Sequence, residues 1–354
     1  MLSVEHKTKM QKQVAPLISV LLLTALLCVS CLPTEPAPLL ASSPVTETPA
    51  PLMLLLATPT LTPFQPLPPT ATLTPTATIR PVATRVLIIS IDGLRPDAIA
   101  NAPMPVLDGI MQGGAYTLQA QTILPPYTLP AHASMLTGLC PSQHGVTWDT
   151  YSPSKGVAQG VDIFDLAHEL GLKTVMLVSK EKLRQVTDVK NVDVFRFVAS
   201  SDENVAKLAA TEIAKGFDLM FVHLDDVDVA GHDYDWASPK YLEAARRADQ
   251  ALSMLIVALE TSGLRDDTLM IISADHAGAG ENHLENDPEV TTIPWILSGV
   301  GIRPMVMNEP VSIVDTAATA AWILNIPLPL EWAGSPVTEA FGIPSESRPV
   351  PRCP

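Results

Sequence analysis

Val86-Leu-Ile-Ile-Ser-Ile91 is a continuous run dominated by β-branched residues, and it leads directly into Asp92-Gly93. Such runs form strands that are buried on both faces, as in parallel sheets. Further strands are predicted at Lys173–Val178, Val192–Phe197, Leu219–Leu224 and Leu269–Ser273. Helical spacing of apolar residues follows or separates these runs in Ile163–Leu170, Asn204–Lys215, Pro239–Thr261 and Val314–Leu324. Strands that alternate with helices predict an α/β fold, a three-layer α/β/α sandwich with a mostly parallel central sheet.

Acidic residues and histidines follow three of the predicted strands. They are Asp92, the pair Asp228 and His232, and Asp275-His276 with His283 seven residues later. Asp228 and His232 are four residues apart, a spacing that lets a carboxylate and an imidazole reach one ion. Ligands of open α/β sheets bind beyond the carboxyl ends of the strands. Each pattern alone is a common turn or cap, but together they predict a two-metal site with oxygen and nitrogen ligands.

A threonine accompanies these residues at the start of a predicted helix. Thr128-Leu-Pro-Ala-His132 follows the loop Pro125-Pro126-Tyr127 and continues into the apolar stretch 133–138. Thr128 is predicted at the N-cap or one residue before it, where free backbone N–H groups and the helix dipole favour an anion. An isolated Thr-x-Pro is usually an ordinary helix cap. Because Thr128 occurs together with the predicted metal ligands, it is a candidate nucleophile.

The charge of the chain restricts its partners. The formal net charge is −15, which is unfavourable for binding nucleic acid, so no nucleic-acid partner is expected. An anionic substrate would need a local positive centre, and the sequence contains no cluster of lysines and arginines that could supply one. Bound metal ions would supply it.

These motifs resemble those of the alkaline phosphatase superfamily, most closely its nucleotide pyrophosphatase/phosphodiesterase branch. The resemblance covers about residues 85–342. The matching residues are Ile91-Asp92-Gly93, Thr128-x-Pro-x-His132, Thr137-Gly138, His144-Gly145, Asp228-x-x-Gly-His232, Asp275-His276 and Thr292-Ile-Pro-Trp295. The resemblance implies one metal bound by Asp92, Thr128, Asp275 and His276, and a second bound by Asp228, His232 and His283. It implies two divalent ions, zinc first and manganese as the alternative.

The resemblance implies a phosphoesterase of phosphodiesterase or nucleotide pyrophosphatase type. Thr128 would attack phosphorus and form a covalent intermediate, and His132 would lie beneath this nucleophile. A phosphomonoesterase or phosphotransferase on the same site is the first alternative. A non-catalytic surface binding protein is the second, although none of the implied ligands is missing. Sulfatases carry Cys or Ser, then Pro and Arg, where this chain has Thr128, Pro130 and His132, so sulfate esters are not expected as main substrates.

Asp149 departs from the family pattern and is predicted to contact the substrate. Relatives commonly carry Asn a few residues after the His-Gly pair, where it donates a hydrogen bond to a phosphoryl oxygen. An ionised carboxylate at ~5 Å would instead repel the phosphoryl group by ~3 kcal/mol at an effective dielectric constant of about 20. Four interpretations stay open: a protonated Asp149, an additional bound cation, a positive group on the substrate, or a side chain that caps the following turn.

The first 84 residues are predicted to lie outside the catalytic domain. Residues 1–30 resemble a lipoprotein signal peptide, with Lys7, Lys9 and Lys12 before an apolar run that ends at Val29-Ser30-Cys31. Cys31 is the predicted lipidated residue, which would attach the protein to the outer face of a membrane. Plain secretion and an uncleaved anchor are the alternatives.

The rest of the chain is predicted to form a tether, one domain and a tail. Residues 31–84 are rich in Pro and Thr and are predicted to be a disordered tether. The catalytic domain is assigned to 85–345 and the tail to 346–354. In an exported protein Cys140 and Cys353 could form a disulfide or remain two free thiols, and the sequence leaves both open.

Overall fold

The computed structural model of the protein describes residues 83–280, 283, 286–344 and 353. In this part of the chain eight strands form one sheet in the order β4-β3-β5-β1-β6-β7-β2-β8. Their bounds are β1 (Arg85–Ile91), β2 (Ala115–Gln121), β3 (Thr174–Val178), β4 (Val194–Phe197), β5 (Leu219–Leu224), β6 (Thr268–Ser273), β7 (Thr292–Gly299) and β8 (Met305–Val306). Neighbouring strands pair in parallel except at β7, which is antiparallel to β6 and β2. The predicted α/β fold with a mostly parallel sheet is confirmed.

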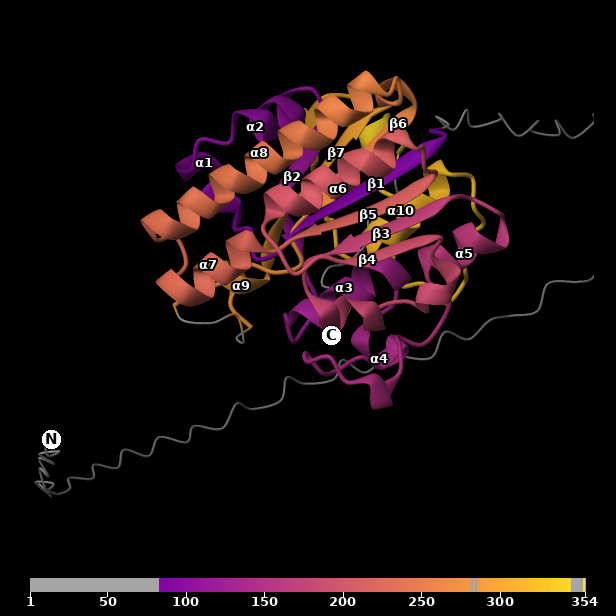
Figure 1. Cartoon of the computed structure of the whole chain (residues 1–354), viewed down its shortest axis with the longest axis horizontal. Coiled ribbons are helices and arrows are strands. Elements are labelled where there is room, and N and C mark those ends of the chain that lie inside the picture. Colours follow the sequence, from indigo (N-terminus) through magenta and orange to yellow (C-terminus); the bar gives the residue numbers. More distant parts are fainter. Residues whose placement is uncertain (1–82, 281–282, 284–285, 345–352, 354) are drawn as a thin grey trace, which may run out of the picture. The chain divides into compact units, whose positions relative to one another are not determined.

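Helices cover both faces of this sheet. They are α1 (Pro96–Asn101), α2 (Pro105–Gln112), α3 (Thr128–Thr137), α4 (Pro141–His144), α5 (Ile163–Glu169), α6 (Asp202–Ala214), α7 (Asp226–Tyr234), α8 (Pro239–Thr261), α9 (Pro288–Thr291) and α10 (Asp315–Ile323). Helices α1, α2, α6 and α7 contact α8, whereas α3 contacts α5 and α10. Figure 1 shows α6 and α8 in front of the sheet and α10 behind it. The helices and the sheet therefore form three layers.

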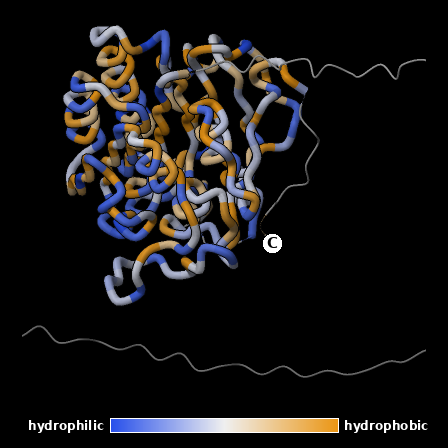
Figure 2. Tube along the Cα trace, turned by 90° about the vertical axis from the view of Figure 1, so that its right-hand side faces the viewer, coloured by the Kyte–Doolittle hydropathy of each residue, from blue (hydrophilic) through white to orange (hydrophobic). Residues whose placement is uncertain are grey.

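The central strands are buried because they have helices on both sides. All residues of β5 and β6 are buried, as are six of the seven residues of β1. The outer helices are instead amphipathic: α8 buries Tyr241, Ala244, Ala248, Leu252 and Leu255, a spacing that keeps them on one face. Figure 2 shows apolar and polar residues alternating along such helices. None of the described helices is both long enough and apolar enough to cross a lipid bilayer.

The predicted strands and helices lie where the sequence places them, with ends shifted by at most two residues. One detail of the prediction is wrong: Thr128 is the first residue of α3, and Tyr127 is the N-cap. Strands β2, β7 and β8 were not predicted. β7 contains Pro294, and the pairing with β2 shifts register between Thr117 and Ala120, opposite this proline. The bulge accommodates a residue that has no N–H to donate.

The predictions for the N-terminal region and for most of the tail lie outside the described residues. They comprise the signal peptide, Cys31 and all but the last residues of the tether. Cys353 is described, and it forms a disulfide with Cys140 at a Cα–Cα distance of 5.2 Å. Of the two alternatives for these cysteines, the structure has the bridge, which ties the C-terminal end to the start of α4.

Candidate active site

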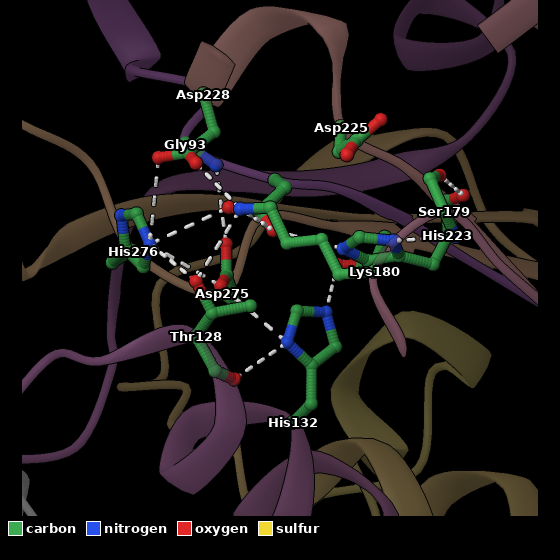
Figure 3. Close-up of polar contacts among 12 residues, drawn as sticks. Gly93, Thr128, His132, Ser179, Lys180, His223, Asp225, Asp228, Asp275 and His276 are labelled. Atoms are coloured by element: carbon green, nitrogen blue, oxygen red, sulfur yellow. Dashed lines mark hydrogen bonds and ion pairs between the residues drawn. The ribbon is translucent and has the colours of Figure 1, made fainter. Parts of the chain in front are cut away.

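The carboxyl ends of three adjacent strands bring the candidate ligands together. β1 pairs with β5 at Ile91 and Leu224, and with β6 at Ser90 and Ser273, so the three strands end at one level. The residues that follow each strand therefore meet at one edge of the sheet. Figure 3 shows Asp228, Asp275 and His276 around one centre, with Thr128 approaching from α3.

The first ligand group consists of Asp92, Asp275 and His276, all fully buried. The Nε2 atom of His276 lies 3.4 Å from Asp92 Oδ1 and 3.4 Å from Asp275 Oδ2. Thr128 Oγ lies 3.4 Å from the same nitrogen. The four residues that the resemblance implies for one metal are thus neighbours around a single point.

The second group consists of Asp228, His232 and His283. His232 Nε2 is 3.5 Å from Asp228 Oδ1, and the rings of His232 and His283 have centroids 5.1 Å apart. The two groups adjoin each other, because His276 Nε2 is 3.9 Å from Asp228 Oδ1. The helical spacing in α7 that brings Asp228 and His232 to one side was the signal in the sequence.

The geometry of both groups fits divalent metal ions. Asp92 Oδ1, Asp228 Oδ1 and Asp275 Oδ2 are buried oxygens without a hydrogen-bond partner among the described residues, an arrangement that is costly unless a cation contacts them. Ligands at 2.0–2.1 Å from a tetrahedral ion are about 3.4 Å apart, which matches the separations of these oxygens from the histidine nitrogens. The donor set of carboxylates and imidazoles is therefore arranged as it would be around metals.

Two histidines have the tautomer that metal binding needs. His276 Nδ1 lies 3.0 Å from the carbonyl oxygen of Ala277, and His283 Nδ1 lies 2.8 Å from that of Pro126. A carbonyl only accepts, so each Nδ1 carries the proton and each Nε2 keeps a free lone pair. Burial lowers the pKa of His276 to about 3, which keeps the ring neutral.

Lys180, which the sequence reasoning missed, lies between the two groups. Its Nζ is 2.7 Å from Asp92 Oδ2, 2.5 Å from Asp228 Oδ2 and 3.5 Å from Thr128 Oγ. The lysine thus binds one oxygen of each carboxylate, and the other oxygen of each, Oδ1, remains for a metal. It follows β3, so its place at the carboxyl end of a predicted strand was the only signal. Figure 3 shows its side chain reaching into the centre.

The buried charges shift one another's pKa values. Burial alone would raise the pKa of Asp92, but Lys180 and a hydrogen bond from His223 hold it well below its usual range. Burial alone would lower the pKa of Lys180, but Asp92 and Asp228 raise it above its ordinary value. Burial and the neighbouring Asp92 raise the pKa of Asp275 well above the usual range. An added cation would relieve that repulsion between carboxylates.

Two histidines outside the two ligand groups contact Thr128 and Asp92. His132 Nδ1 is 2.7 Å from the carbonyl oxygen of Thr128, and its Nε2 is 2.8 Å from Ser90 Oγ. The predicted position of His132 beneath Thr128 agrees with this contact. His223, for which the sequence suggested no role, lies 2.8 Å from Asp92 Oδ2 through Nε2. Both rings are completely buried and restrict the rotation of the groups they contact.

Asp149 lies beside the start of α3 and already has two partners. Its Oδ1 accepts a hydrogen bond from the Leu129 N–H at 2.8 Å, and its Oδ2 pairs with Lys182 Nζ at 2.7 Å. The positive group that compensates this carboxylate therefore belongs to the chain itself. The Leu129 N–H, one of the donors that the sequence predicts to be free for an anion, is occupied.

The chain resembles known proteins in sequence and in fold. The family model described as type I phosphodiesterase/nucleotide pyrophosphatase matches residues 86–292. A venom phosphodiesterase of Crotalus durissus collilineatus is 26% identical over 213 residues, which cover 54% of this chain and 26% of the relative. Human ectonucleotide pyrophosphatase/phosphodiesterase family member 5 is 24% identical over 211 residues, covering 54% of this chain and 44% of the relative. The chain thus spans about a quarter of the first relative's length and less than half of the second's.

Solved structures share the fold. Murine ectonucleotide pyrophosphatase/phosphodiesterase 5 superimposes with a TM-score of 0.57 at 17% identity, covering 69% of this chain and 96% of that one. A 2-O GAG sulfatase gives a TM-score of 0.64 at 14% identity, covering 75% and 76%. Because the family model matches more than half of the sequence, this chain belongs to the type I phosphodiesterase/nucleotide pyrophosphatase family of the alkaline phosphatase superfamily.

Proposed function

We propose that the chain is a metal-dependent phosphoesterase that hydrolyses phosphodiesters or nucleotide pyrophosphates, with Thr128 as the nucleophile. The observation that carries this proposal is the position of the Thr128 hydroxyl. Its Oγ lies 3.4 Å from His276 Nε2 and 3.5 Å from Lys180 Nζ, at the point where the two ligand groups adjoin. A free threonine hydroxyl is a weak nucleophile, so it needs this environment to react.

Two divalent ions are proposed at the ligand groups, one at Asp92, Thr128, Asp275 and His276 and the other at Asp228, His232 and His283. Such ions stabilise negative charge on phosphoryl oxygens and favour the ionised form of a bound hydroxyl. Zinc is proposed first because calcium and magnesium prefer ligand sets made only of oxygen. Manganese is the alternative.

The residues of the chain divide the reaction into two displacements. Thr128 Oγ loses its proton, attacks phosphorus and forms an O–P bond, while the bond from phosphorus to the leaving oxygen breaks and the leaving oxygen takes up a proton. A water molecule then attacks phosphorus, the bond to Thr128 breaks, and the hydroxyl is restored. Lys180 is close enough to donate a hydrogen bond to a phosphoryl oxygen on Thr128, and His132 holds the Thr128 backbone.

The relatives support a nucleotide-like diester as the substrate class. A structure of the murine relative is described as an inactive threonine-to-alanine variant in complex with AMP. Phosphotransfer on the same site is the second candidate, because mouse GPI ethanolamine phosphate transferase 3 is 26% identical over 136 residues, covering 37% of this chain and 12% of the relative. The sulfatase neighbours share only the fold. Asp149 is proposed to act on the substrate through Lys182, which it holds near the site.

The test compares a chromogenic phosphodiester, phosphomonoester and sulfate ester under identical conditions, with metal analysis of the same sample. The proposal predicts the fastest hydrolysis for the diester, loss of activity after chelation, and recovery with zinc or manganese. A faster monoester reaction would favour the first alternative. A sample that holds metal but turns over none of the three esters would favour a binding protein.

We also propose that residues 31–84 tether the domain to the outer face of a membrane through lipid on Cys31. This proposal rests on the lysine-led apolar run that ends at Cys31. Mass spectrometry of the mature N-terminus tests it. A free amine on any other residue, with the protein in the soluble fraction, would indicate plain secretion instead.

A further inference from the structure

Three carboxylates outside the candidate active site lie close together where α6 and α7 begin. Asp202 is the first residue of α6, and Asp225 and Asp226 form the junction between β5 and α7. Each offers one oxygen, and the three oxygens lie within 4.8 Å of one another. Asp202 is fully buried, whereas the other two are partly exposed. None of them has a role in the proposed hydrolysis.

Asp202 differs from an exposed surface carboxylate in its burial and in its hydrogen bonds. Its Oδ1 accepts hydrogen bonds from the backbone N–H groups of Asp225 at 2.8 Å and Asp226 at 3.2 Å. Its Oδ2 is buried and has no hydrogen-bond partner in the part of the chain that the structure describes. Burial and the neighbouring Asp226 raise the pKa of Asp202 well above its usual range. An oxygen without a partner in such a place is costly unless a donor or a cation contacts it.

The net charge around the three carboxylates favours a divalent cation. Among the described residues no salt bridge reaches Asp202 or Asp225, and Asp226 has one, with Arg247 Nε at 3.5 Å. A bound cation favours the ionised form of Asp202 despite its raised pKa, and with all three carboxylates ionised the cluster and one guanidinium carry two net negative charges, which a divalent cation would neutralise. Arg247 is about half exposed, so it does not close the cluster from solvent.

We propose that Asp202, Asp225 and Asp226 bind a calcium ion, separate from the two metals of the active site. Calcium takes oxygen ligands at 2.3–2.6 Å and tolerates irregular geometry, so oxygens within 4.8 Å of one another can share one ion. Magnesium demands a near-octahedral arrangement and usually takes only one or two carboxylates. Water would complete the coordination on the exposed side of Asp225 and Asp226.

The ion would fix the start of α7 against the start of α6. This matters for the active site because α7 carries Asp228 and His232, two and six residues after Asp226. Bound calcium would therefore limit the movement of two ligands of the second metal group without contacting that metal. The inference does not depend on which ester the active site hydrolyses.

The test is a thermal unfolding series on the zinc-loaded protein with added calcium chloride. The wild type is expected to gain roughly 5–10 °C in Tm at a calcium concentration about a hundred times the Kd. The Asp202→Asn variant keeps a carbonyl oxygen for the two backbone N–H groups but loses the charge. It is expected to show no calcium-dependent gain.

Two further variants serve as a second test and as a matched control. Asp226→Asn changes a partly exposed ligand and should also abolish the gain, which keeps the test valid if the Asp202 variant does not fold. Glu203→Gln is the matched control, since Glu203 lies in the same turn of α6 but points to solvent, where it pairs with Lys207. It should respond like the wild type. A wild type without any calcium response, or Asp202 and Asp226 variants that respond like the wild type, would overturn the proposal.

Discussion

Replacing Lys180 with methionine tests whether the lysine charge and the proposed metal ions neutralise the same carboxylates. The Lys180 side chain is 16% exposed, and its Nζ contacts Asp92 and Asp228, one carboxylate from each ligand group. Methionine has a similar length but no charge. In the metal-free protein the change leaves two buried carboxylates without their shared cation.

The size of the effect follows from the two distances. At 2.7 Å and 2.5 Å, each pair has a gross attraction of about 6 kcal/mol at an effective dielectric constant of about 20. The cost of burying the charges offsets much of this attraction. Removing one partner of a buried pair typically costs about 3–5 kcal/mol. We expect the free energy of unfolding of the metal-free protein to fall by this amount.

Bound metals should reduce the loss. Two divalent ions at the Oδ1 atoms would neutralise the same carboxylates, so the variant should lose about 2 kcal/mol less when it is loaded. By thermodynamic linkage, the difference between the stability losses of the metal-free and the metal-loaded variant equals the change in its free energy of metal binding. The variant should therefore bind zinc about 30-fold more tightly than the wild type, because ~1.4 kcal/mol corresponds to a factor of ten.

The measurement is urea unfolding of both proteins, after chelation and after zinc loading, together with a competitive zinc titration. Lys240→Met is the matched control, since Lys240 pairs with Glu243 at 2.9 Å on the surface and should contribute less than about 1 kcal/mol. An equal loss of stability with and without zinc would refute the reasoning. It would mean that Lys180 and the metals do not share carboxylates.

Three other changes have defined outcomes. Asp149→Asn should raise kcat/KM for an anionic diester, because it frees the charge of Lys182, which Asp149 holds near the start of α3; adding Lys182→Met should cancel the gain, and unchanged rates from pH 5 to 9 would contradict this. Burial lowers the pKa of His144 to about 4, so protons bind preferentially to the unfolded chain and about 3 kcal/mol of stability should be lost as the pH falls from 6.5 to 4. Unfolding curves of His144→Asn should lack this loss. Cys353→Ser opens a bridge across a sequence separation of 213 residues and should lower the free energy of unfolding by up to about 5 kcal/mol, as measured in urea, while activity at 25 °C stays unchanged.

The strand ends explain why so much of the site could be predicted from the sequence. Strands that are buried on both faces are continuous apolar runs, and the residue after each run lies at the ligand-binding edge of a parallel sheet. This rule makes Asp92 and Asp275 candidates, and the combination of several such strand ends makes them predicted ligands. The structure brings the aspartates and histidines that the family resemblance implied as ligands into two groups, and Thr128 lies beside the first of them.

Lys180 was missed because its role depends on the order of the strands. It follows β3, and only the position of β3 next to β5 brings its side chain to Asp228. Hydrophobic periodicity shows that a strand exists but not which strand lies beside it. A lysine after a strand also has many solvated positions open to it, so the residue type alone indicates nothing.

β7 and the contacts of Asp149 were missed for different reasons. Pro294 within β7 argues against a strand in a sequence, and only the bulge in β2 makes it acceptable. Asp149 was predicted to contact the substrate, and the sequence left four interpretations of its charge open. Its partners, the Leu129 N–H and Lys182, lie 20 and 33 residues away, and sequence spacing does not show which donors approach a side chain.

The most direct test of the central proposal is the turnover of Thr128→Ala, measured on zinc-loaded samples whose metal content is matched to the wild type. If Thr128 is the nucleophile, hydrolysis of a chromogenic diester should fall at least about a thousandfold in the folded variant. Thr128→Ser, which keeps a hydroxyl, should retain part of the activity. An alanine variant that hydrolyses the diester within about tenfold of the wild-type rate would contradict the proposal.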